Sequence, residues 1–291
     1  MNFNIYTVVD EDYIPGLIAL VNSARFHGFK GKFIVGMTEK ITNKPNIEGL
    51  EFVNINSNGY WAGNTKPYLI LNNPSEKFIF IDSDIIINNE DFFTRLNQIV
   101  NYGLVLTIES LLPKNDYRRY LWNKKHSKYF SEYYYNSGFI AGIWERDKEF
   151  VEKWWSEIIN NIDPPGRLYE NSTYPMADQD ALNAVLQDYK GNIVSLTSPD
   201  VWYAANSDKP FIHVGGFKTP AILHCTGKEK TWLLDKIPNR FPTIYDLSWY
   251  KFAVTENKNF KFKLNLSNYI KWWLEERKII KYYIKLLKYL T

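Results

Sequence analysis

The sequence predicts an α/β fold in which helices flank a buried sheet. Short apolar runs of strand composition alternate with segments of helical spacing over the first hundred residues, which is the pattern of a nucleotide-binding half. The chain has 291 residues, 45% of them hydrophobic, and is long enough for one large domain. One apolar run ends in two carboxylates, which are costly to bury unpaired. We therefore expect them at the ends of strands, where ligands of open α/β sheets bind.

The elements follow one another without a low-complexity linker. Helical spacing predicts a helix over 13–26 that stops near Gly28, and another over 67–71 with Lys66 at its head. Further helices are expected over 148–159 and 178–187. Runs rich in branched and aromatic residues predict strands over 5–9, 32–37, 50–55, 78–81, 104–107, 136–144 and 221–224.

The most informative motif is Asp82-Ser83-Asp84. Four apolar residues precede it and three isoleucines follow it, a composition typical of a buried strand that ends at the carboxylates. Side chains two apart on extended backbone point to the same side, so both carboxylates could reach one divalent cation, which would hold a diphosphate. The alternative is a turn that caps a helix. A separate turn cluster at residues 88–91 favours the metal site.

Four other segments carry polar side chains that could take part in chemistry. Lys66 precedes Asp82 by 16 residues, and Asn136-Ser137-Gly138 begins an apolar strand. Asp178-Gln179-Asp180 opens a helix, and a final segment runs from His224 through Gly227 and Lys230 to Trp232. Taken singly, these segments read as a solvated charge, a turn, a helix cap and a histidine that binds no metal.

Together and in this order, the segments resemble the retaining GT-A glycosyltransferases of glycosyltransferase family 8. That family includes glycogenin and bacterial lipopolysaccharide galactosyl- and glucosyltransferases. The resemblance runs from Tyr6 to Trp232. It implies a GT-A fold over residues 1–265, with a Rossmann-like nucleotide-binding mixed sheet flanked by helices. Two positions depart from the family pattern. Ser137 stands where Ala is frequent, and Thr231 stands where Pro is frequent, which predicts a less rigid phosphate-closing loop.

The resemblance implies a role for each matching residue. Mn²⁺ would be bound by Asp82, Asp84 and His224, with Mg²⁺ as the alternative cation. The UDP-sugar donor would be bound by Val8, Asp10, Asp12, Lys66, Ser83, Asn136, Gly227 and Lys230. Among these, Asp10 would accept from the uracil N–H, and Gly227 and Lys230 would close over the phosphates. Asp178 and Gln179 would be the catalytic pair that positions the sugar, and together with Asn136 they would line it.

The implied reaction transfers galactose or glucose from UDP to a glycan or lipid-linked saccharide, as in lipopolysaccharide or surface-glycan synthesis. An amide is a poor nucleophile, so Gln179 favours a front-face substitution over a covalent intermediate. A sugar-phosphate nucleotidyltransferase is a different enzyme class that would show a Gly-rich basic signature near the N-terminus, where this chain has Val9-Asp10-Glu11-Asp12. A non-catalytic glycan- or membrane-binding protein with a transferase-like fold, or a glycogenin-like self-glucosylating protein, are further alternatives.

Composition and charge bear on location and partners. The single cysteine, Cys225, fits a reducing compartment, and neither a signal peptide nor a membrane span is expected. Residues 271–291 hold six basic and two acidic side chains, whereas the whole chain has a net charge of only +3. The net positive charge of the chain is therefore a property of the tail, which argues against a nucleic-acid partner. Lysine and apolar stripes at helical spacing predict an amphipathic helix over 266–291 on an anionic membrane surface. We expect a cytoplasmic protein, peripheral to the inner face of the membrane.

Overall fold

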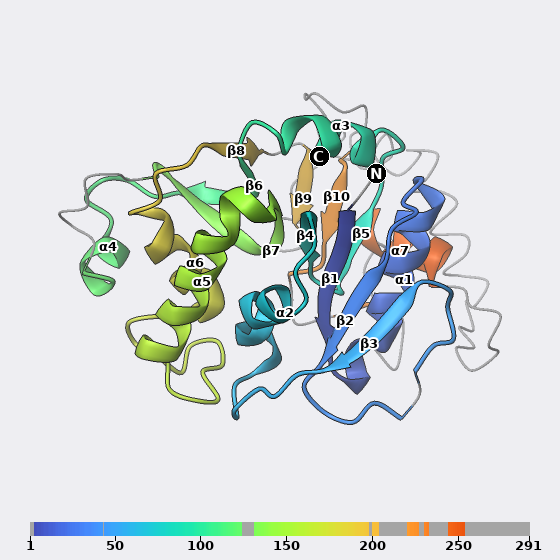
Figure 1. Cartoon of the computed structure of the whole chain (residues 1–291), viewed down its shortest axis with the longest axis horizontal. Helices are drawn as coiled ribbons and strands as arrows, with labels where there is room; N and C mark the ends of the chain where they lie inside the picture. Colours follow the sequence, from blue (N-terminus) through green and yellow to red (C-terminus); the bar gives the residue numbers. More distant parts are fainter. Residues whose placement is uncertain are drawn as a thin grey trace, which may run out of the picture.

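The computed structural model describes residues 3–42, 44–123, 131–197, 200–203, 220–226, 230–232 and 244–253. Seven strands form one sheet with the order β3-β2-β1-β4-β7-β6-β8 (Figure 1). These strands are β1 (Phe3–Val9), β2 (Phe33–Met37), β3 (Leu50–Asn54), β4 (Lys77–Ile81), β6 (Leu104–Leu111), β7 (Tyr133–Ile143) and β8 (Ile193–Leu196). β7 runs antiparallel to its neighbours β4 and β6, and the other neighbouring pairs are parallel. The predicted mixed sheet is confirmed.

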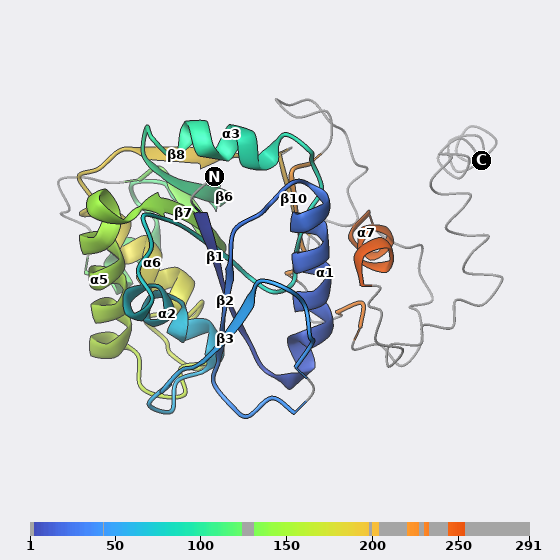
Figure 2. The same cartoon turned by 45° about the vertical axis from the view of Figure 1, so that its right-hand side comes forward.

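Helices cover both faces of this sheet (Figure 2). One face packs against α1 (Ile14–Phe26) and α3 (Phe92–Ile99). The other packs against α2 (Lys66–Asn72), α5 (Trp144–Asn161) and α6 (Asp178–Leu186). Two 3-10 helices, η1 (Glu11–Tyr13) and η2 (Ala62–Thr65), precede α1 and α2, and the short helix α4 (Tyr117–Leu121) follows β6. Because β1, β4 and β6 run in the same direction, their carboxyl ends lie on one edge of the sheet.

A second, three-stranded sheet lies beside α1, on the same side of the large sheet, and was not expected from the sequence. Its order is β5-β10-β9, from β5 (Ile85–Ile87), β10 (Ile222–His224) and β9 (Val201–Tyr203). β10 pairs antiparallel with β5 and parallel with β9, and α7 (Ile244–Phe252) packs against β10 and α1. The three isoleucines after Asp84 therefore belong to a different sheet from the apolar run before Asp82.

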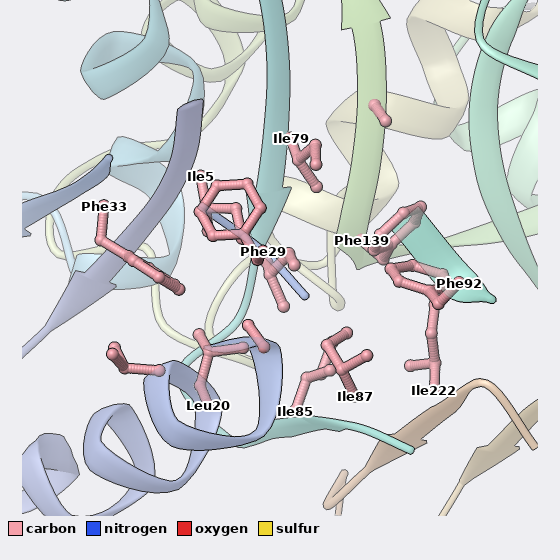
Figure 3. Packing of buried hydrophobic residues seen from close by; sticks show 14 of the residues in the cluster. Ile5, Leu20, Phe29, Phe33, Ile79, Ile85, Ile87, Phe92, Phe139 and Ile222 are labelled. Carbon is pink, nitrogen blue, oxygen red and sulfur yellow. The ribbon is translucent and has the colours of Figure 1, made fainter. Parts of the chain in front are cut away.

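Buried side chains between the large sheet, α1 and the small sheet form a continuous core (Figure 3). Ile79 of β4, Leu20 of α1 and Ile85 of β5 all belong to it and are almost completely buried. Each buried aliphatic or aromatic side chain contributes about 1.5–3 kcal/mol. Because β4 and β5 are both held in this core, the short segment that joins them has little freedom to move.

The predicted boundary at residue 265 and the predicted tail helix over 266–291 lie outside the described residues. Among the described residues, none of the helices has both the length and the apolar character required to cross a bilayer.

Candidate active site

Two carboxylates and an imidazole converge at one edge of the large sheet. Asp82 and Asp84 lie between β4 and β5, and His224 is the last residue of β10. One ligand atom from each residue lies within 4.8 Å of the others. His224 Nε2 is 3.2 Å from Asp84 Oδ1 and 3.8 Å from Asp82 Oδ2. The structure therefore brings together the three residues for which the family resemblance implied a metal site.

The backbone geometry behind this convergence differs from the prediction. The sequence predicted extended backbone through Asp82-Ser83-Asp84, but Ile85 N donates to Asp82 O at 3.0 Å and closes a turn. Asp82 N donates to Gly138 O at 2.8 Å, and Cys225 N donates to Asp84 O at 3.1 Å. These bonds tie the turn to β7 and to the segment that follows β10. A turn fits better than a strand because β4 and β5 belong to different sheets.

Gly138 of β7 leaves the room that the cluster needs. A Cβ at this position would lie 2.5 Å from His224 Cε1 and 2.7 Å from Asp82 Oδ2, closer than real Cβ contacts allow. Glycine is thus the residue that lets the backbone pass this close to the carboxylate and the imidazole.

The donor set fits a divalent cation. Asp84 Oδ1 is buried without a hydrogen-bond partner among the described residues, although it faces His224 Nε2. A buried carboxylate oxygen without a partner is costly, and a bound cation would satisfy it. Two carboxylates with one imidazole suit a borderline cation better than a purely oxygen-seeking one.

Two buried lysines flank the cluster. Lys66, at the start of α2, lies with its Nζ 3.1 Å from Asp82 Oδ1, 3.0 Å from Asp178 Oδ2 and 3.1 Å from Ser137 Oγ. On the other side, Lys230 Nζ lies 2.5 Å from Asp84 Oδ2 and donates to the carbonyl of Cys225. Ser137, which departs from the family pattern, therefore adds a hydroxyl partner to Lys66.

The lysines and the carboxylates stabilise one another's charged forms. Burial alone would lower the pKa of Lys66, but Asp178 and Asp82 outweigh it and hold the pKa above its usual value. The pKa of Lys230 is raised in the same way, against burial, chiefly by Asp84. Burial would raise the pKa of Asp84, yet Lys230 and His224 hold it below its usual range. Both lysines therefore remain ammonium ions beside a site that could hold a cation, an arrangement that suits a polyphosphate ligand.

The segment after Lys230 is anchored to two helices. Thr231 Oγ1 donates to Asp246 Oδ1 of α7 at 2.7 Å, and both residues are buried. Trp232 Nε1 donates to the carbonyl of Asp12 at 2.8 Å, and its ring meets that of Tyr13 edge to face. A side-chain hydrogen bond thus constrains position 231, where the family pattern has proline.

The predicted catalytic pair opens α6. Asp178 and Gln179 are buried, and the carbonyl of Asp178 accepts from Trp154 Nε1 at 2.9 Å. The preceding residue, Ala177, has a φ of 49°, which is rare for a residue with a side chain. Burial raises the pKa of Asp178 more than Lys66 lowers it. This strained turn places the pair beside Lys66 and β7.

A carboxylate that the sequence analysis missed joins the predicted sugar-lining residues. Gln179 Nε2 donates to Glu109 Oε2 at 2.8 Å, and Asn136 Nδ2 donates to the same oxygen at 3.1 Å. Glu109 lies near the carboxyl end of β6, which is parallel to β4. The rule that singled out Asp82, a carboxylate after an apolar strand, could have found Glu109 as well.

The remaining predicted residues are distributed as follows. Val8 lies near the end of β1, and Asp10 caps η1 by accepting from Tyr13 N at 3.1 Å. Burial raises the pKa of Asp10. Asp12 is exposed in η1, Ser83 is buried in the turn between the metal-site carboxylates, and Gly227 lies outside the described residues.

No protein-family model matches this sequence, and a search of curated proteins found no match. Solved structures do match its fold. The galactosyltransferase LgtC in complex with donor and acceptor sugar analogs matches with a TM-score of 0.55 and 15% identity, over 86% of this chain and 95% of that chain. An active-site mutant of LgtC matches equally well, at 16% identity and with the same coverage. The bifunctional glycosyltransferase WbbM matches with a TM-score of 0.53 and 16% identity, over 86% of this chain and 51% of that one. The predicted GT-A fold is confirmed.

Proposed function

We propose that this chain is a metal-dependent retaining glycosyltransferase of the family 8 type, which transfers a hexose from a UDP-sugar to a saccharide acceptor. One observation carries the proposal. Asp82, Asp84 and His224 converge at the carboxyl edge of a sheet with the fold of LgtC, between two buried lysines. Ligands of open α/β sheets bind at this edge.

The arrangement accounts for the departure of a nucleoside diphosphate. A cation held by Asp82, Asp84 and His224 would neutralise charge on the diphosphate, and Mn²⁺ suits a site with one imidazole. Lys230 lies next to Asp84. Its side chain would turn toward the leaving phosphate and place the ammonium group against the phosphate oxygens. Val8, Asp10 and Asp12 lie at the end of β1 and would bind the uridine, while Ser83 lies between the metal-site carboxylates.

The geometry also favours substitution from the front face of the sugar. A double displacement needs a free nucleophile, but both carboxylates next to the Gln179 amide are engaged. Asp178 lies 3.0 Å from Lys66 Nζ, and Glu109 accepts from Gln179 and Asn136. Asp178 would instead hold Lys66 in place, and Gln179 would position the sugar while the leaving phosphate accepts the proton of the acceptor hydroxyl. Isolation of a glycosyl adduct on Asp178 would overturn this mechanism.

The acceptor and the location rest on the sequence alone. A lipid-linked saccharide in surface-glycan synthesis fits the family resemblance, and the basic stripe of residues 271–291 would hold the enzyme on the inner face of an anionic membrane. Removal of residues 271–291 should then abolish binding to anionic liposomes and leave donor hydrolysis intact. Loss of both would identify the tail as part of the folded domain.

UDP release from a panel of UDP-sugars, with Mn²⁺ or with EDTA, tests the proposed function. Metal-dependent release from one donor, lost in Asp84→Ala and kept in the control Asp91→Ala, is the expected result. Asp91 is an exposed aspartate outside the cluster whose side chain caps nothing. No release from any donor, together with no binding of UDP, would favour the non-catalytic alternative.

A further inference from the structure

Glu109 lies in a bulge of β6. Ile108 pairs with Tyr135 and Ser110 pairs with Tyr134, so the register shifts at Glu109 and leaves it without a partner on β7. A bulge redirects the side chain that it carries, and bulges are frequent beside active sites. Here the redirected carboxylate contacts both α6, through Gln179, and β7, through Asn136.

One oxygen of this carboxylate holds two amide side chains. Glu109 Oε2 accepts from Gln179 Nε2 at 2.8 Å and from Asn136 Nδ2 at 3.1 Å. The oxygens of both amides are also fixed, because Gln179 Oε1 accepts from Ser137 N at 3.3 Å and Asn136 Oδ1 accepts from Gly138 N at 2.8 Å. Exchanging oxygen and nitrogen in either amide would place an oxygen against the carboxylate and an NH₂ group against a backbone N–H.

We infer that Glu109 is a positioning residue, which fixes the orientation of Gln179 and Asn136 toward the transferred sugar. The inference rests on the proposed function, in which Gln179 positions the sugar, and on the family resemblance, which implies that Asn136 lines the same sugar. Hydrogen bonds to a carboxylate are stronger than bonds between neutral groups, so Glu109 constrains the amides more firmly than a neutral residue would. A misplacement of about 1 Å at a reacting centre can cost about 100-fold in rate.

The surroundings of Glu109 favour a role in orienting the amides over a role in stabilising the fold. Its side chain is exposed, and it contributes nothing to the hydrophobic core. Substitution of such a surface residue usually changes stability little. Loss of activity in a Glu109 variant that remains folded would therefore report on the orientation of the amides and not on the fold.

The test compares Glu109→Ala and Glu109→Gln with the control Glu152→Ala, an exposed glutamate of α5. Glu109→Ala should lower kcat about 100-fold and leave KM for the donor nearly unchanged, because the amides are still present but no longer fixed. Glu109→Gln should fall between the wild type and Glu109→Ala, since its amide oxygen can still accept from both NH₂ groups but binds them more weakly than a carboxylate oxygen. Equal loss in both variants would overturn the inference and assign the effect to the negative charge.

A double-mutant cycle with Gln179→Ala tests whether Glu109 acts through Gln179. If it does, Glu109→Ala should change kcat by no more than about threefold once Gln179 has been removed. An undiminished effect in that background would overturn the inference.

NMR of the side-chain amides separates this inference from the proposed function. The NH₂ signals of Gln179 and Asn136 should shift in Glu109→Ala and stay in place in Glu152→Ala, whether or not any donor is turned over. Unchanged signals would contradict the positioning role, whereas shifted signals in a protein without turnover would contradict only the glycosyltransferase proposal.

Discussion

Replacement of Lys66 by methionine should destabilise the protein strongly. Lys66 is buried, and its ammonium lies within 3.1 Å of both Asp82 and Asp178. Methionine fills similar space but leaves two carboxylates without their counter-ion. Removal of one partner from a buried ion pair typically costs about 3–5 kcal/mol. We expect the free energy of unfolding to fall by about that amount, and the melting temperature to fall by about 10 °C.

Urea unfolding of the metal-free protein in EDTA measures this effect. The control is Lys148→Met, in which the lysine lost is an exposed partner of Glu152 and unfolding should stay close to that of the wild type. The double variant Lys66→Met with Asp178→Asn should recover part of the loss, because one unpaired charge is removed with its partner. A Lys66→Met protein as stable as the control variant would refute the claim that Lys66 is the buried counter-ion of these two carboxylates.

Three further predictions concern other residues. Burial raises the pKa of Asp180 to about 6 from 3.8, so the folded state binds this proton more tightly and the free energy of unfolding should fall by about 3 kcal/mol as pH rises from about 4 to about 6. Urea unfolding measured across this pH range should show the fall in the free energy of unfolding for the wild type. The fall should be absent in Asp180→Asn. Gly138→Ala should weaken Mn²⁺ binding, measured by calorimetry, at least about tenfold, because the new Cβ would press on His224 and Asp82. Thr231→Val should lower the free energy of unfolding by about 1–3 kcal/mol through loss of the buried hydrogen bond to Asp246. Thr231→Ser keeps this bond and should cost only about 0.8 kcal/mol, for the lost methyl group.

Much of the fold could be predicted because strand composition is a local property. The runs at residues 5–9, 33–37 and 78–81 are apolar on both faces, as strands covered by helices on two sides must be. The second sheet could not be predicted in the same way. Ile85–Ile87 has the composition of a buried strand in either sheet, and its pairing with β10 joins segments more than 130 residues apart.

The site could be predicted in part, for a related reason. Asp82 lies at the end of a predicted strand, where ligands of open α/β sheets bind, whereas the roles of Lys66 and His224 followed only from the family resemblance. Glu109 follows an apolar run as Asp82 does, but its contact with Gln179 and Asn136 depends on a bulge and on pairing with β7, which the sequence does not show. The bond between Thr231 and Asp246 was missed because it depends on where α7 packs.

Calorimetric titration of UDP into the protein tests most directly whether the Asp82, Asp84 and His224 cluster binds a cation that holds the diphosphate. Binding is expected with Mn²⁺ present, and it should be lost both with EDTA and in Asp84→Asn. Equal UDP affinity with Mn²⁺, with EDTA and in the variant would contradict a metal-dependent donor site at this cluster.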